Sequence, residues 1–158
     1  MKKIAILVTA ALSSAMMMAQ PAPGSFEQSW TRGPEWLRDG VIYQVYPSSY
    51  KDSDGNGIGD IRGVISKLDY IEKLGVRAIW FNPIFVSGWI DGGYDIIDFY
   101  RVDPRFGTNN DLVELVEKAH AKGIKIMLDL VAGHTSDKHP WFIQSMQDTN
   151  LQYSDYYI

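Results

Sequence analysis

Apolar residues follow two alternating patterns through most of the chain. Three short runs are nearly continuously apolar, as in strands of a parallel sheet buried on both faces; they are residues 41–46, 76–81 and 124–131. The intervening segments 61–74 and 112–119 have apolar residues three or four positions apart, which predicts helices. The order strand, helix, strand, helix, strand predicts right-handed β-α-β crossovers.

Turn-forming residues predict where these elements end. The expected boundaries are Gly75 after the first helix, Asn110 or Asp111 as the N-cap of the second helix, and Gly123 after it. The other expected elements are a long loop at 82–107, a local strand within it at 95–100, and a short helix from Pro140 to Gln147.

An α/β chain of this kind fits two architectures, an open doubly wound sheet or a (β/α) barrel. The glycine-rich G-x-G-x-x-G turn of a dinucleotide-binding fold is absent from the sequence. Polar and aromatic residues instead follow the carboxyl end of each predicted strand, where barrel enzymes place their active sites. The pattern therefore favours a barrel.

The first 35 residues read as a leader rather than as part of the fold. Residues 1–19 have a short basic start, an apolar stretch and a small residue at the end, which predicts a signal peptide cleaved before Gln20. A membrane anchor is the alternative, but the run is short for a stable membrane span, and Pro21 and Pro23 follow at once. Residues 20–35 are expected to be a linker. The expected location is therefore secreted or periplasmic.

Composition narrows the function classes further. The formal net charge is −4 and no basic stripe is present, so nucleic acid is not an expected partner. The chain has no cysteine, which excludes disulfides and lipid attachment through cysteine. Aromatic residues make up 13% of the chain. Their faces suit sugar rings, although composition alone favours a role in the core.

Oxygen-bearing side chains alternate with glycines directly after the first predicted strand. The potential ligands are Asp52, Asp54, Asn56, the carbonyl of Ile58, and Asp60. Calcium and magnesium prefer such hard oxygen ligands, and the glycines allow a tight backbone. An EF-hand would have Glu where this chain has Gly63, so the loop is of another kind. A polar turn is the alternative, but the mutual repulsion of three nearby acids favours a cation.

Two further stretches could bind a ligand. Asp129 ends a buried strand, where an unpaired charge is costly, and His134 lies five residues later. We expect Asp129 to have a charged partner, a hydrogen-bond network or a functional role. The run Gly92-Gly93-Tyr94-Asp95 combines a flat ring with a carboxylate, which suits a pyranose, although a plain hairpin turn would explain it equally well.

In combination and order, residues 41–85 and 92–142 closely resemble the N-terminal third of the α-amylase family of glycoside hydrolases. Within that family they are most similar to the branch of oligo-1,6-glucosidases and α-glucosidases. The resemblance implies a partial TIM (β/α)8 barrel. Residues 36–131 would be its N-terminal part, with the first three βα units, and residues 132–158 would begin a domain inserted after the third strand.

The resemblance also implies roles for single residues. Tyr94 and Asp95 match a pair that holds the glucose unit next to the scissile bond, Tyr94 by stacking and Asp95 by hydroxyl contacts. His134 matches a histidine that contacts the same sugar, and Asp129 an aspartate that orders the site. The loop with Asp52, Asp54, Asn56, Ile58 and Asp60 matches the calcium or magnesium loop of this branch.

The implied activity is retaining hydrolysis of an α-glucan or α-linked oligosaccharide. The family's nucleophile, acid/base and third carboxylate follow the fourth, fifth and seventh strands, so we expect them beyond residue 158 and expect residues 1–158 alone to be inactive. Two alternatives remain open: a non-catalytic relative that serves as a partner-binding subunit, and a transglycosylase such as a trehalose synthase.

Overall fold

The computed structural model describes residues 34–38, 40–147 and 152–158. The expected signal peptide at 1–19 and residues 20–33 of the expected linker lie outside these ranges. Contacts divide the chain into two units, Met1–Asp39 and Gly40–Ile158. In the first unit, the structure describes one short helix, α3 (Glu35–Arg38).

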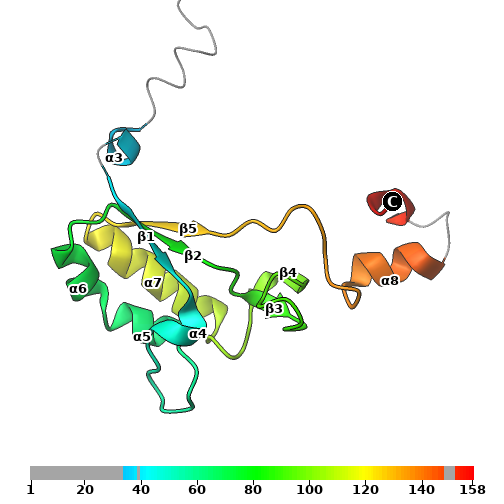
Figure 1. Ribbon diagram of the computed structural model, residues 1–158, viewed down its shortest axis with the longest axis horizontal. Coiled ribbons are helices and arrows are strands. Elements are labelled where there is room, and N and C mark those ends of the chain that lie inside the picture. Colours follow the sequence, from blue (N-terminus) through cyan, green and yellow to red (C-terminus); the bar gives the residue numbers. More distant parts are fainter. Residues whose placement is uncertain (1–33, 39, 148–151) are drawn as a thin grey trace, which may run out of the picture. The chain divides into compact units, whose positions relative to one another are not determined.

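Three parallel strands form the sheet that the sequence predicts. They are β1 (Ile42–Val45), β2 (Ala78–Phe81) and β5 (Lys125–Leu128), in the order β1-β2-β5. Figure 1 shows them side by side, all running in the same direction. Val45, Phe81 and Leu128 are in register at their last positions. The polar residues that follow the strands are therefore brought to one edge of the sheet.

The segment predicted as a single helix at 61–74 forms two helices, α5 (Ile61–Ile65) and α6 (Leu68–Lys73). The Ser66 hydroxyl donates to the carbonyl of Gly63 at 2.6 Å, and Lys67 N–H donates to the carbonyl of Val64 in a tighter turn. Side-chain bonds of serine to the preceding turn compete with regular helix. The spacing of apolar residues does not reveal this break, because the buried residues of both helices still face the same core.

The second predicted helix, α7 (Asn109–Ala121), begins with a different cap from the one predicted. Thr108 is the N-cap: its hydroxyl oxygen accepts the N–H of Asp111 at 3.2 Å, and the Asp111 carboxylate accepts the N–H of Thr108 at 2.8 Å. This is a capping box. The expected cap at Asn110 or Asp111 was therefore wrong. The predicted ends at Gly75 and Gly123 are confirmed by left-handed φ angles of 76° and 74°.

The long segment between β2 and α7 contains an antiparallel hairpin of β3 (Phe85–Ser87) and β4 (Ile96–Val102). The sequence predicts β4 approximately but not β3, whose three residues are too few to show a period. The predicted helix at 140–147 is confirmed as α8 (Pro140–Gln147). The described residues of this unit also form two short elements, α4 (Pro47–Tyr50) and the 3₁₀ helix η1 (Ser154–Tyr156).

The core lies between the sheet and the helices, where α5, α6 and α7 lie on one side of the strands (Figure 1). Val45, Ile79 and Phe81 point into this core and are almost fully buried. The expectation that both faces of the strands are buried holds only in part, since Ile42 and Trp80 are 38% and 36% exposed. No helix in residues 34–38, 40–147 and 152–158 combines the length and the apolarity needed to cross a bilayer.

Candidate functional site

A chain of hydrogen bonds connects the carboxyl ends of all three parallel strands. Gln44 in β1 donates through Nε2 to Asn82 Oδ1 at 3.1 Å, and Asn82 Nδ2 donates to the Tyr94 hydroxyl at 3.1 Å. Tyr94 in turn donates to Asp129 Oδ2 at 2.8 Å. Asn82 directly follows β2, and Asp129 directly follows β5. Side chains far apart in sequence therefore form one polar rim, here called the strand-end network: Gln44, Asn82, Tyr94 and Asp129.

His134 lies against the same tyrosine. Its Nε2 is 3.1 Å from the carbonyl oxygen of Tyr94. A carbonyl only accepts hydrogen bonds, so His134 Nε2 carries the proton and donates. The ring is exposed, which leaves Nδ1 open to another partner. The structure thus brings together Tyr94, Asp129 and His134, as the sequence analysis expects, while their contacts with a sugar stay a prediction.

The pairing of Tyr94 with Asp129 satisfies both groups. The hydrogen bond to the Asp129 carboxylate, followed by burial, raises the pKa of the Tyr94 hydroxyl. The hydroxyl therefore stays protonated and keeps donating at any physiological pH. The half-buried Asp129 carboxylate has the hydrogen-bond network that its position at a strand end was expected to require.

Asp95 points into the protein rather than onto this rim. Asp95 is 9% exposed, and its carboxylate accepts hydrogen bonds from the Ser87 hydroxyl at 2.6 Å and from the N–H groups of Ile90 and Asp91 at 3.1 and 3.2 Å. Burial alone would raise its pKa, but these hydrogen bonds outweigh it and lower the pKa. Its predicted contact with sugar hydroxyls stays untested, and its actual partners support a role in holding the loop.

Three residues of this region were missed by sequence reasoning. Asp91 is exposed three positions before Tyr94, and its charge contributes to the raised pKa of the tyrosine. Its position in a glycine-containing loop, three residues before an aromatic residue, could have identified Asp91 as a candidate ligand-binding residue. Gln44 and Asn82 were missed because their role depends on register between strands. Only the position of Asn82 directly after a predicted strand pointed to it.

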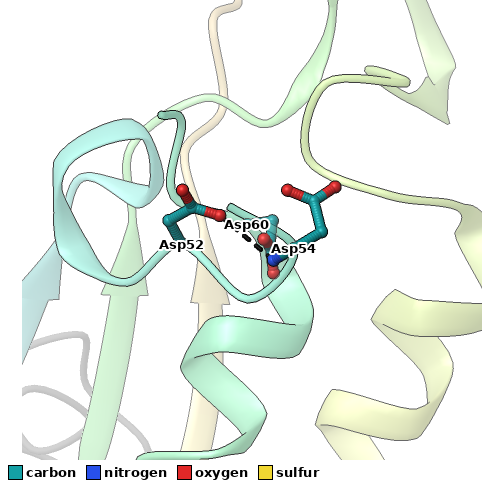
Figure 2. Close-up of side chains that lie close together, drawn as sticks. All are labelled: Asp52, Asp54 and Asp60. Atoms are coloured by element: carbon teal, nitrogen blue, oxygen red, sulfur yellow. Dashed lines mark hydrogen bonds between the residues drawn. The ribbon is translucent and has the colours of Figure 1, made fainter. Parts of the chain in front are cut away.

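The loop after β1 gathers three carboxylates. One oxygen from each of Asp52, Asp54 and Asp60 lies within 4.8 Å of the others. Figure 2 shows the three side chains close together near the start of α5. Calcium binds oxygens at about 2.3–2.6 Å. Two oxygens on opposite sides of one ion are separated by about twice that distance, which is close to the 4.8 Å found here. The donor set is made of hard oxygens and fits calcium or magnesium.

Backbone N–H groups shape this loop around its first aspartate. The Asp52 carboxylate accepts the N–H groups of Gly57, Gly55 and Asp54, and these bonds lower its pKa, that of Gly57 most strongly. Gly55 and Gly57 have φ angles of 84° and 89°, a region that disfavours residues with a Cβ. Asp52 therefore remains ionised where the turn places it.

The other expected ligands, Asp60, Asn56 and Ile58, differ in their surroundings. Asp60 Oδ1 caps α5 through the N–H of Gly63 at 2.6 Å, while Oδ2 accepts from the N–H and the hydroxyl of Ser53. Asn56 lies beside Asp54, with Nδ2 3.1 Å from Asp54 Oδ2. The side chain of Ile58 packs against the core, and the role of its carbonyl as a ligand stays a prediction.

Comparison with known proteins identifies the family. The catalytic domain of alpha amylase matches residues 44–158. The chain is 49% identical over 124 residues to the oligo-1,6-glucosidase of Heyndrickxia coagulans, covering 78% of this chain and 22% of that protein. It is 48% identical over 128 residues to the trehalose-6-phosphate hydrolase of Escherichia coli strain K12, covering 81% and 23%.

Solved structures show the same relationship. The trehalose-6-phosphate hydrolase of Bacillus licheniformis superposes with a TM-score of 0.77 at 49% identity, covering 79% of this chain and 22% of that one. For the isomaltulose synthase of Klebsiella sp. LX3 the TM-score is 0.76 at 48% identity, covering 80% and 23%. The chain thus spans 22–23% of the length of these relatives.

These matches confirm the partial (β/α)8 barrel that the family resemblance implies. The strands β1, β2 and β5 with their crossover helices are its βα units. The chain belongs to the α-amylase family of glycoside hydrolases, in the branch similar to oligo-1,6-glucosidases.

Proposed function

We propose that this chain supplies one wall of the glucose-binding site of an α-glucosidase that acts on short α-linked oligosaccharides with retention of configuration. The observation that carries the proposal is the strand-end network, which holds Tyr94 between Asn82 and Asp129 at the carboxyl edge of the sheet. Barrel enzymes assemble their sites at this edge from residues after several strands.

Each residue of the rim has a distinct part in this proposal. The Tyr94 ring offers an apolar face for a pyranose, and its hydroxyl is held by two partners, so the ring is oriented before substrate arrives. His134 is fixed through Nε2 and presents Nδ1 to a sugar hydroxyl. Asp91 is exposed in the same loop and can accept hydrogen bonds from hydroxyls. Asp129 orders Tyr94 and does not attack the substrate.

Retaining cleavage needs two carboxyl groups about 5 Å apart across the sugar. We assign neither role to Asp91, Asp95 or Asp129, because the first is placed for binding and the other two are engaged in the fold. The residues described here bind and orient the glucosyl unit. The curated relatives include glucan 1,6-alpha-glucosidase and palatinase, which supports α-glucosides as the substrate class.

Transfer to a sugar acceptor is the second candidate function. Among the solved relatives are a trehalulose synthase and the isomaltulose synthase, at 44% and 48% identity. The glucose-binding rim would serve either reaction, since both hold a glucosyl unit. Whether water or a sugar accepts that unit separates the two candidates.

The proposed function is tested by assaying the protein together with any sequence that its gene encodes beyond Ile158. Isomaltose, maltose and sucrose are the probes, and products are separated by chromatography. Release of glucose from the first two supports the α-glucosidase, and formation of a new disaccharide from sucrose supports transfer. No turnover of any α-glucoside would overturn the proposal in favour of a non-catalytic family member.

We further propose that the protein is exported, on the basis of the signal-peptide pattern at 1–19.

We also propose that the loop after β1 holds a calcium or magnesium ion, with Asp52, Asp54, Asn56, the carbonyl of Ile58, and Asp60 as ligands. Such an ion would offset the repulsion among the three carboxylates. The loop leads directly into α5 through the Asp60 cap. In this proposal the bound ion fixes the start of α5. The ion has no direct part in positioning Tyr94, which lies far away in sequence.

The cation site is tested by calorimetric titration with calcium. Asp54→Asn is the sharpest variant, because Asp54 is exposed and its carboxylate accepts hydrogen bonds from Asn56 within the same loop. Loss of one charged ligand should weaken calcium binding by at least 10-fold while the far-ultraviolet circular dichroism stays the same. Asp155→Asn, an exposed acid in η1, is the control. Equal affinities in Asp54→Asn and the parent protein would rule out this loop as the cation site.

A further inference from the structure

The loop that carries Tyr94 contains a strained residue, Trp89. It has a φ angle of 59° and is the one non-glycine residue with positive φ in the part of the chain that the structure describes. Bulky side chains rarely adopt this region, and such strain persists only where surrounding contacts enforce it. Strained residues gather at functional sites, so the contacts of Trp89 need an explanation.

Those contacts hold the indole on several sides. Its Nε1–H donates to Oδ2 of Asp103 at 2.8 Å, and Asp103 is only 6% exposed. The guanidinium carbon of Arg105 lies 3.7 Å from the centre of the ring, in cation–π geometry. The Phe106 ring lies edge-on to the indole, with the two ring centres 5.3 Å apart. The backbone N–H of Trp89 donates to the Ser87 hydroxyl at 3.0 Å.

The same indole reaches the residue before Tyr94. A Cβ placed on Gly93 would lie 3.6 Å from Cη2 of Trp89 and 3.3 Å from the carbonyl oxygen of Pro83. Gly93 itself has a φ angle of 105°. The residue that precedes Tyr94 therefore lies beside both the indole of Trp89 and the carbonyl of Pro83. Moving the indole would release the segment that sets the position of the tyrosine.

We propose that Trp89 and Asp103 form a positioning clamp that sets the orientation of Tyr94 toward the glucosyl unit. The clamp rests on the proposed role of Tyr94 in sugar binding. Neither residue needs to touch the substrate: Asp103 holds the indole, the indole holds the backbone at Gly93, and Tyr94 follows. Buried Asp95 holds the intervening N–H groups of the loop and complements the clamp.

Core packing alone does not account for this arrangement. A large apolar residue in an unstrained conformation would fill the same space beside Phe106. The structure instead combines a strained backbone with a hydrogen bond from the indole to a buried carboxylate. The clamp explains this combination, because the indole must then point in one direction in order to set the backbone at Gly93.

The test is a double-mutant cycle on the protein with any sequence its gene encodes beyond Ile158. Trp89→Phe keeps an aromatic ring but removes the N–H donor. It should lower kcat/KM for isomaltose by roughly 10-fold, within the range that misplacing a substrate contact produces. In a Tyr94→Ala background the same change should cost less than about 2-fold, because the ring whose orientation the clamp sets has been removed. Trp141→Phe, in the aromatic cluster of α8, is the matched control.

Equal losses from Trp89→Phe in the two backgrounds would overturn the clamp. A parent protein without turnover would overturn the proposed function instead, and the clamp is then decided by nuclear magnetic resonance. Under the clamp, Trp89→Phe and Asp103→Asn shift the amide signals of Gly93 and Tyr94, while Trp141→Phe leaves them in place. Unshifted signals in the first two variants would contradict the clamp without reference to activity.

Discussion

Replacing Tyr94 by Phe is expected to lower kcat/KM for α-glucosides by roughly 10- to 100-fold. The change removes only the hydroxyl oxygen, which accepts from Asn82 and donates to Asp129. A hydrogen bond to a charged group contributes about 1.5–3 kcal/mol, and each 1.36 kcal/mol is a factor of ten. Without it the ring still offers a face to a sugar but is no longer held. Steady-state kinetics on isomaltose measures the loss.

Two variants define what this loss means. Asp129→Asn keeps an acceptor for the Tyr94 hydroxyl without the charge, so its loss should be smaller than that of Tyr94→Phe. Tyr70→Phe removes a hydroxyl from an exposed position on α6 and should leave kcat/KM unchanged. If Tyr94→Phe retains the kcat/KM of the parent, the strand-end network has no part in catalysis.

Replacing Asp95 by Ala is expected to destabilise the protein by about 3 kcal/mol. The change leaves the Ser87 hydroxyl and the N–H groups of Ile90 and Asp91 without their acceptor. A buried donor left unpaired costs about 1–3 kcal/mol, and part of this is recovered if water enters. Urea denaturation measures the change in the free energy of unfolding. Asp91→Ala removes an exposed carboxylate of the same loop and should have little effect on stability.

The same pair separates binding from folding. If Asp91 rather than Asp95 contacts the sugar, Asp91→Ala lowers kcat/KM while stability is unchanged. A stable Asp95→Ala variant with reduced kcat/KM would instead restore the substrate-binding role that the sequence assigns to Asp95.

The effect of Asp95 on stability should also depend on pH. Its hydrogen bonds lower the pKa in the folded protein, although burial opposes them. A carboxylate with a lowered folded pKa stabilises the protein above its unfolded pKa of about 3.9, and this contribution is lost as pH falls through the folded value. The stability difference between the parent and Asp95→Ala should therefore shrink below about pH 4.

Much of the barrel follows from local properties of the chain. Period and composition suffice to predict β1, β2, β5, α7 and α8, because the apolar pattern of each lies within its own short segment. Gly75 and Gly123 end helices through a backbone angle that depends on the residue itself. The carboxylates Asp52, Asp54 and Asp60 lie within nine residues, so the turn alone brings them together.

Other features depend on partners far away in sequence. Nothing near Asp95 indicates that its carboxylate turns inward, because that depends on Ser87 being brought alongside by the pairing of β3 with β4. The part played by Asn82 depends on Tyr94 lying above the end of β2. The strain of Trp89 is stabilised by Asp103, fourteen residues later.

The sequence by itself therefore determined the order of strands and helices, the acidic loop and the set of polar residues that follow the strands. Only the tertiary structure decided which of these residues share a surface and which are held inside the fold. The physical reason is that periodicity reports whether a residue meets core or solvent, whereas hydrogen-bond partners are chosen by strand register and loop path.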